Sequence, residues 1–169
     1  MNPRGVTSAT VFHSSSPDET RLWGRVLGAA LIDGDVVVLD GALGAGKTTF
    51  TQGIALGMGL SDSVTSPTFV VAREMSAGET GVQLLHVDAY RVRSRNEWDD
   101  LDLDMESAAT VVEWGERVAD ALPTDRLDIT LTNAGADDAR ELSVIAHGPR
   151  SERLLAALVA GWRDGQSAP

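Results

Sequence analysis

The chain has 169 residues, of which 43% are hydrophobic and 23% are charged, and this composition predicts one globular domain with a sizeable core. Because 25 Asp and Glu residues outnumber 14 Lys and Arg residues, the net charge of -11 disfavours direct binding of nucleic acid. The lack of cysteine excludes disulfides and cysteine-based zinc sites, and three scattered histidines offer no metal-ligand spacing. Since no apolar run is long enough for a membrane span and the N-terminus does not resemble a signal peptide, we expect no membrane partner and a cytoplasmic location.

Hydrophobic periodicity predicts alternating helices and strands along the chain. The sequence Ser16-Pro17-Asp18-Glu19 is a capping box with proline at the first helical position, which predicts a helix that ends at the Asp33-Gly34 turn. Further helices are expected at residues 47–58, 118–122 and 152–162, with one or two short helical turns in the acidic stretch 97–106. Strands are expected at residues 36–39, 69–72, 82–88, 110–114, 127–132 and 141–146, and Val11 and Phe12 are candidates for a short edge strand.

A glycine-rich loop between a buried strand and a helix carries the strongest functional signal. Residues 41–48 read GALGAGKT and match the pattern G-x-x-x-x-G-K-[ST] in full. Three glycines let successive backbone N–H groups point at an anion, and the following helix adds the positive end of its dipole. We therefore expect Lys47 to contact the β and γ phosphates of ATP and the Thr48 hydroxyl to bind Mg²⁺. The alternative, an accidental glycine turn before a core helix, needs a match that arises in roughly one chain per hundred.

The loop and the mixture of strands predict the architecture. Buried, parallel-type strands together with hairpins indicate an α/β, P-loop NTPase-like fold of three layers, with a mixed, mainly parallel central sheet and antiparallel hairpins. We find no internal repeat and no long linker. The expected organisation is a flexible N-terminal segment (residues 1–15), a single P-loop ATPase domain (residues 16–163) and a frayed tail (residues 164–169).

Two carboxylates follow strands that we expect to lie beside the loop. Asp88 ends the run at residues 84–88 and resembles a Walker B aspartate, while Glu113 ends the run at residues 110–113. Ligands of open α/β sheets bind at the carboxyl ends of strands, so each carboxylate could hold Mg²⁺ directly, hold it through water, or orient the attacking water. We expect both to be catalytic together with Lys47, although a strand-end carboxylate that only caps the next turn is the simpler alternative.

Other polar residues allow two interpretations each. The segment at residues 66–68 is either a mobile, phosphate-sensing loop or a plain turn. His86 either reaches the site or is a core histidine, with the core role favoured. Arg91 and Arg140 either reach phosphate or form salt bridges, with salt bridges favoured. Trp114 either stacks on a ligand or, more often for such a residue, packs in the core.

Four motifs together resemble the TsaE (YjeE) family of P-loop ATPases over about residues 16–150. They are GALGAGKTT at 41–49, SPTF at 66–69, HVDAYR at 86–91 and VVEW at 111–114, in this order and spacing. The resemblance implies that Thr48 and Glu113 bind Mg²⁺ and that Asp88 is essential to ATP turnover. The residues then expected to bind nucleotide are Gly41, Ala42, Leu43, Gly44, Ala45, Gly46, Lys47, Thr48, Thr49 and Arg140. One departure is Ala42, where the family commonly has an acidic residue, and this change could alter a partner contact.

The resemblance also implies a function. Proteins of this family work with TsaD and TsaB proteins to make threonylcarbamoyladenosine at the tRNA adenosine next to the anticodon. The expected activity is that of an Mg²⁺-dependent ATPase, slow alone and dependent on TsaD-type and TsaB-type partners, which reaches tRNA only through that complex because its own surface is acidic. Two alternatives are a small-molecule kinase, for which Arg91, Arg93 and Arg95 would make a poor lid, and a nucleotide-gated binding module with little hydrolysis.

Overall fold

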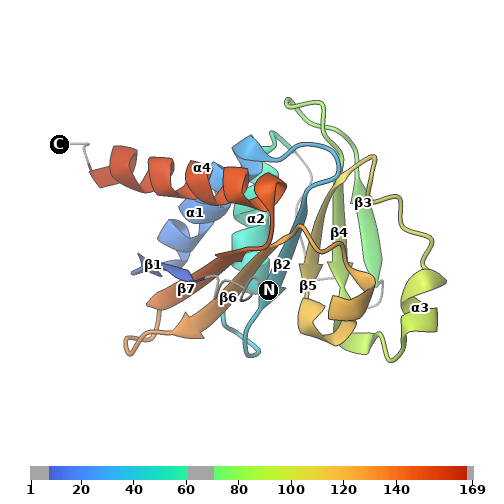
Figure 1. The fold of residues 1–169 in the computed structure, drawn as a ribbon. Coiled ribbons are helices and arrows are strands. Elements are labelled where there is room, and N and C mark those ends of the chain that lie inside the picture. The colour runs from blue at the N-terminus through green and yellow to red at the C-terminus, as the bar shows by residue number, and fades with distance from the viewer. Residues whose placement is uncertain (1–7, 61–70, 167–169) are drawn as a thin grey trace, which may run out of the picture.

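A computed structural model describes residues 8–60 and 71–166 (Figure 1). The helices are α1 (Pro17–Ala30), α2 (Lys47–Gly57), α3 (Arg95–Asp99) and α4 (Pro149–Gln166), with 3₁₀ helices η1 (Ala89–Arg91) and η2 (Gly115–Ala121). The strands are β1 (Thr10–Ser14), β2 (Val36–Asp40), β3 (Ala72–Met75), β4 (Leu84–Asp88), β5 (Ala109–Glu113), β6 (Leu127–Asn133) and β7 (Arg140–Ala146). No helix in these ranges is long and apolar enough to cross a membrane.

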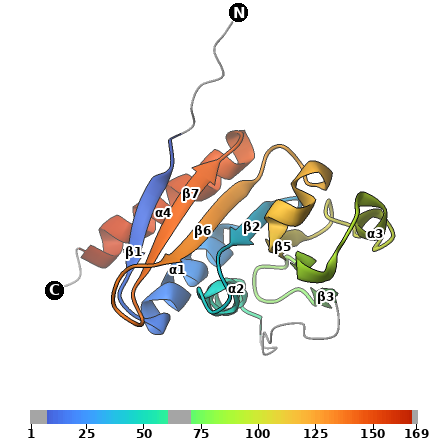
Figure 2. The same cartoon turned by 90° about the horizontal axis from the view of Figure 1, so that it is seen from below.

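The strands form one mixed sheet in the order β1-β7-β6-β2-β5-β4-β3. Four central neighbours, β6, β2, β5 and β4, pair in parallel, whereas β7 and β3 pair antiparallel with their neighbours and β1 pairs antiparallel with β7. Seen from below in Figure 2, β1 lies at one edge of the sheet and β3 at the other. The predicted mainly parallel sheet with antiparallel hairpins is confirmed.

Helices cover both faces of the sheet, as expected for three layers. Val37 and Leu39 of β2 belong to the core that α1, α2 and α4 close, while Val36 and Val38 belong to a second core closed by Trp98 of α3 and by η2 (Figure 1). Successive β2 residues therefore alternate between two buried faces. This explains why the run is apolar without interruption, as the sequence interpretation of a buried parallel strand requires.

Helix α1 begins at the predicted capping box and packs very closely on α2. Ser16 Oγ accepts a hydrogen bond from the Glu19 N–H (3.2 Å), and the Glu19 carboxylate accepts one from the N–H of Ser15 (2.7 Å). A Cβ atom added at Gly28 would lie 2.1 Å from the carbonyl oxygen of Ile54 in α2, so the two backbones are in direct contact there. Because α2 follows the glycine-rich loop, this packing fixes the direction in which the loop ends.

Several predicted boundaries need correction. The edge strand at Val11 and Phe12 is confirmed, but it extends over residues 10–14, which therefore belong to the sheet and not to a flexible segment of residues 1–15. Helix α4 begins earlier than residue 152 and includes residues 164–166 of the predicted frayed tail. Strand β3 begins at Ala72, the last residue of the predicted run at residues 69–72, and residues 61–70 are outside the described ranges. The helix predicted at residues 118–122 is the 3₁₀ helix η2.

Candidate active site

The loop between β2 and α2 has the backbone conformation that its glycines predict. Gly46, the residue before α2, has φ of 106°, a left-handed conformation that side-chain-bearing residues rarely adopt. At Gly41 a Cβ atom would lie 2.5 Å from the carbonyl oxygen of Leu131 in β6, so only glycine fits as the chain leaves β2. The loop therefore ends at the N-terminus of α2, where unpaired backbone N–H groups and the helix dipole favour an anion.

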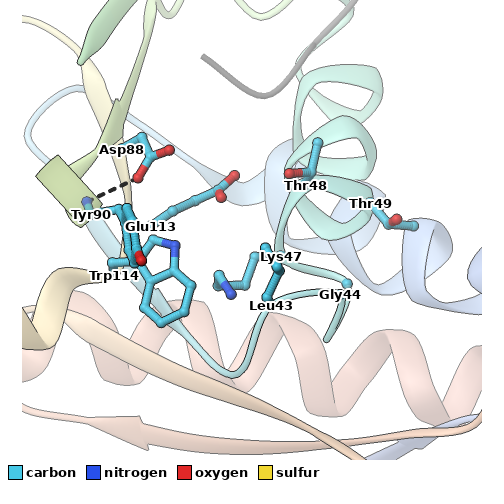
Figure 3. Close-up of a pocket in the computed structure, with 10 residues that line it drawn as sticks. Leu43, Gly44, Lys47, Thr48, Thr49, Asp88, Tyr90, Glu113 and Trp114 are labelled. Carbon is cyan, nitrogen blue, oxygen red and sulfur yellow. Dashed lines mark hydrogen bonds between the residues drawn. The ribbon is translucent and has the colours of Figure 1, made fainter. Parts of the chain in front are cut away.

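A cavity of about 350 Å³ lies beside the loop and is lined by residues from three strand ends (Figure 3). Its lining residues are Leu43, Gly44, Gly46, Lys47, Thr48, Thr49, Asp88, Tyr90, Glu113 and Trp114. The cavity thus brings together most of the predicted loop residues with both predicted carboxylates. Gly41, Ala42 and Ala45 are not among the lining residues, and Ala45 is buried in the core.

Lys47 lies at the base of this cavity with only 6% of its surface exposed. Its Nζ donates hydrogen bonds to the carbonyl oxygens of Gly41 (2.6 Å) and Ala42 (3.0 Å) and lies 4.0 Å from the centre of the Trp114 ring. Burial lowers the pKa of Lys47 below its usual value, and the charge of Glu113 is the largest opposing influence. The ammonium group is thus held by two backbone carbonyl oxygens and one aromatic ring at the place where the sequence motif requires a cation.

The two predicted carboxylates lie side by side on neighbouring parallel strands. Asp88 at the end of β4 pairs in register with Glu113 at the end of β5. Glu113 is 3% exposed, and its Oε1 lies 2.9 Å from Nε2 of His86, which is itself buried. One Asp88 oxygen accepts a hydrogen bond from the N–H of Tyr90 (3.0 Å) and so caps η1, as the simpler interpretation of this residue predicted. Asp88 also lines the cavity, and its role in catalysis stays a prediction.

His86 and Trp114 take part in the site more directly than the sequence suggested. His86 is buried, as favoured, but its ring is bonded to Glu113 and therefore orients that carboxylate. Trp114 has a left-handed backbone (φ 59°) and covers Lys47, and its ring centre lies 5.1 Å from that of Tyr90 (Figure 3). Sequence analysis did not identify Tyr90 as a cavity residue. The available signal was an aromatic residue two positions after a strand-end carboxylate.

Arg140 does not form the salt bridge that the sequence favoured with any of the described residues. Its Nε donates to the carbonyl oxygen of Ala45 (2.9 Å) in the loop, and its Nη1 donates to the carbonyl oxygens of Asp137 and Ala139 (2.8 Å each). The favoured salt bridge is therefore replaced by bonds to backbone oxygens. Arg140 does not line the 350 Å³ cavity, but it lines a hollow of about 70 Å³ on another side of the loop, together with Thr20, Thr49 and Asp138.

The last candidates from the sequence are Arg91, the segment at residues 66–69 and the metal ligands. Arg91 is exposed at the end of η1, and the segment at residues 66–69 lies outside the described ranges. Within residues 8–60 and 71–166, no group of three or more His, Cys, Asp or Glu side chains could hold a metal ion. The oxygen ligands available in the cavity, Thr48 and the two carboxylates, suit Mg²⁺, which keeps several waters and commonly takes its other ligands from phosphate.

Comparisons with known proteins show which family the chain resembles. The family model described as threonylcarbamoyl adenosine biosynthesis protein TsaE matches residues 14–142. A protein of Streptomyces coelicolor named tRNA threonylcarbamoyladenosine biosynthesis protein TsaE is 43% identical over 144 residues, which cover 82% of this chain and 97% of that protein. A protein of the same name from Bacillus subtilis is 40% identical over 146 residues, which cover 85% of this chain and 89% of that protein.

A solved structure shares the fold. The crystal structure of Bacillus subtilis YdiB aligns with a TM-score of 0.76 and 34% sequence identity, and the alignment covers 90% of this chain and 95% of that chain. The part of the sequence that the family model matches includes the loop, both carboxylates and the beginning of β7 with Arg140.

Proposed function

The chain belongs to the TsaE family, and from this premise we propose that it is an Mg²⁺-dependent ATPase that serves the biosynthesis of threonylcarbamoyladenosine in tRNA. One observation carries the ATPase part of the proposal. Lys47, Thr48, Asp88 and Glu113 come from α2, β4 and β5, yet all four line a single cavity at the N-terminus of α2. A cation, a hydroxyl and two carboxylates around an anion-binding helix end are the parts that phosphoryl-transfer sites share.

The nucleotide would occupy both hollows that adjoin the loop. The phosphates fit the cavity against the N-terminus of α2, where Lys47 exchanges its two carbonyl partners for phosphate oxygens. The smaller hollow shares Gly44, Gly46 and Thr49 with the cavity. A nucleotide whose phosphates lie in the cavity and whose remaining part follows the loop would therefore enter the smaller hollow. In this proposal Arg140, which lines the smaller hollow, contacts the part of the nucleotide that lies beyond the loop.

The two carboxylates are suited to different roles. Thr48 and Glu113 would hold Mg²⁺, because Glu113 is almost fully buried and its orientation is fixed by His86. When bound, the ion neutralises charge on the transferred phosphoryl group. Asp88 is less buried and has one oxygen engaged by the Tyr90 N–H, which leaves the other oxygen to orient the attacking water.

The site supports a requirement for partners. Among the cavity-lining residues in the described ranges, Lys47 is the one cation, and no arginine side chain reaches the cavity. Phosphate-loop enzymes that gain a missing arginine from another protein accelerate by about 10³ to 10⁵. We therefore propose that TsaD-type and TsaB-type proteins complete the site, and that their surfaces contact the tRNA, which a chain of net charge -11 would repel.

The kinase alternative receives no support from the arginines that follow Asp88. Arg95 donates one hydrogen bond to the Asp99 carboxylate (2.9 Å) and another to the carbonyl oxygen of Asp120 (3.0 Å), so its guanidinium joins α3 to η2. A kinase lid requires arginines that close over the phosphates. An assay can separate the ATPase from the kinase and from a binding module that hardly hydrolyses ATP. It measures phosphate release from ATP by the protein alone, by the protein with candidate metabolites, and by the protein with the two partner proteins.

The binding part of the proposal has a sharp test, because Lys47 is the only lysine among the 169 residues. We expect Lys47→Ala to lose most of its affinity for Mg-ATP in a calorimetric titration while its melting temperature stays near that of the wild type. Arg25→Ala, which removes one exposed positive charge on α1, is the matched control and should bind ATP normally. In the wild type, ATP should also slow acylation of Lys47 by an amine-reactive ester, as read from the mass of the peptide that contains it. Unchanged affinity in folded Lys47→Ala protein refutes the assignment of the phosphate site.

A further inference from the structure

The loop that carries Trp114 is attached to the end of β2 by two hydrogen bonds. The N–H of Trp114 donates to the carbonyl oxygen of Leu39 (2.9 Å), and the N–H of Glu116 donates to Oδ1 of Asp40 (3.2 Å). The first bond joins two backbone groups and therefore does not depend on the side chains at positions 39 and 114. The second depends on a side chain, and Asp40 is also the last residue of β2 before the glycine-rich loop.

This attachment holds a strained conformation. Trp114 has φ of 59° and ψ of 35°, a left-handed conformation that a bulky residue adopts only when its surroundings determine it. The next residue, Gly115, packs against β2 so closely that a Cβ atom there would lie 2.4 Å from Cγ1 of Val38. The contact between Gly115 and Val38 fixes one point of the loop. The hydrogen bond from the Glu116 N–H to Asp40 fixes the next residue and so opposes a return of Trp114 to an ordinary backbone conformation.

Two groups of the cavity depend on this conformation. The Trp114 ring covers the Lys47 ammonium at 4.0 Å, and Glu113 immediately precedes Trp114 in the chain. We infer that Asp40 is a positioning residue, whose carboxylate oxygen holds the loop after β5 and thereby places the Trp114 ring over Lys47 and Glu113 in the cavity. The effect on turnover rests on the proposed function, whereas the effect on Lys47 does not.

An alternative role for Asp40 is purely electrostatic. Asp40 is half-buried, burial raises the pKa of its carboxyl group, and its negative charge acts on Lys47. The two roles differ in what an amide can replace. Asp40→Asn keeps an oxygen that accepts the Glu116 N–H but loses the charge, and Asp40→Ala loses both.

The first test measures Lys47 directly and needs no nucleotide. Because Lys47 is the only lysine, its acylation rate by an amine-reactive ester can be followed in one peptide, with the N-terminal amine as the internal reference. We expect faster acylation of Lys47 in Asp40→Ala, because the Trp114 ring no longer covers the ammonium, and a rate near that of the wild type in Asp40→Asn. Asp120→Ala, which removes an exposed carboxylate of η2, is the matched control and should leave the rate unchanged.

The second test measures ATP turnover in the presence of the partner proteins. Asp40→Ala should lower kcat about fivefold, the factor that corresponds to one lost hydrogen bond, with a smaller change in KM, and Asp40→Asn should restore most of the loss. Equal acylation of Lys47 in the wild type and Asp40→Ala overturns the inference whether or not the protein binds ATP. Equal changes in Asp40→Ala and Asp40→Asn also overturn it, because they assign the effect to charge. Failure of the wild type to bind ATP contradicts the proposed function instead.

Discussion

The contact between α1 and α2 can be tested by adding one methyl group. In Gly28→Ala the new Cβ would lie 2.1 Å from the Ile54 carbonyl oxygen, where ordinary contacts begin at 3.4 Å. The clashing atom belongs to a helix backbone, so the two helices must separate and loosen the buried side chains of Leu27 and Ile54. Overpacking of this kind costs about 1–3 kcal/mol, with larger values where backbone must move, and alanine returns about 1 kcal/mol of helix propensity.

We expect a net loss of about 2 kcal/mol for Gly28→Ala, which for a protein of this size lowers the melting temperature by about 4–8 °C. Thermal unfolding followed by circular dichroism measures this shift. The control is Gly165→Ala in α4, where a Cβ meets no atom within 4 Å, and the substitution should be neutral or slightly stabilising. If Gly28→Ala melts at the same temperature as Gly165→Ala, the conclusion that the backbones of α1 and α2 are in direct contact at Gly28 is wrong.

Much of the site could be predicted because its parts are local in sequence. The strand, glycine loop and helix at residues 36–58 are contiguous, and each has its own periodicity or motif. Asp88 and Glu113 could be predicted from one topological rule, since the carboxyl ends of the parallel strands β2, β5 and β4 lie at the same edge of the sheet. The register that pairs the two residues confirms that rule in this chain.

The contacts that were missed depend on distances between segments that are far apart in the chain. The bond between His86 and Glu113 requires the register of β4 on β5, and the Trp114 ring reaches Lys47 only because the chain turns into a left-handed conformation after β5. Neither register nor a left-handed tryptophan has a signal in composition or periodicity. Arg140 was assigned to salt bridges for a similar reason, because the Ala45 carbonyl oxygen that its Nε meets in the loop lies 95 positions away in the sequence.

Three further predictions concern stability. Thr110 Oγ1 is buried without a hydrogen-bond partner among the described residues, so Thr110→Val should raise the free energy of unfolding in urea by about 1 kcal/mol; a decrease would indicate that the hydroxyl has a partner. Asp35 is fully buried and pairs with two arginines of α4 whose side chains are 42% and 40% exposed. Asp35→Ala should lower the free energy of unfolding by about 2 kcal/mol, less than the loss of one partner costs in a fully buried ion pair, because water can solvate the two arginines that remain. An unchanged urea midpoint would contradict this. The third prediction depends on pH. Burial alone raises the pKa of Asp125, but hydrogen bonds from the hydroxyl (2.7 Å) and N–H (2.9 Å) of Ser151 outweigh it, so the pKa lies below the ordinary value of 3.8. Because the folded state binds the proton less well than the unfolded chain does, Asp125 stabilises the fold above about pH 3.8, and this contribution is lost as the pH falls through its folded-state pKa. Asp125→Asn should therefore melt below the wild type at pH 7 and approach it at pH 2–3, whereas a constant difference across this range would show that ionisation of Asp125 is not the cause.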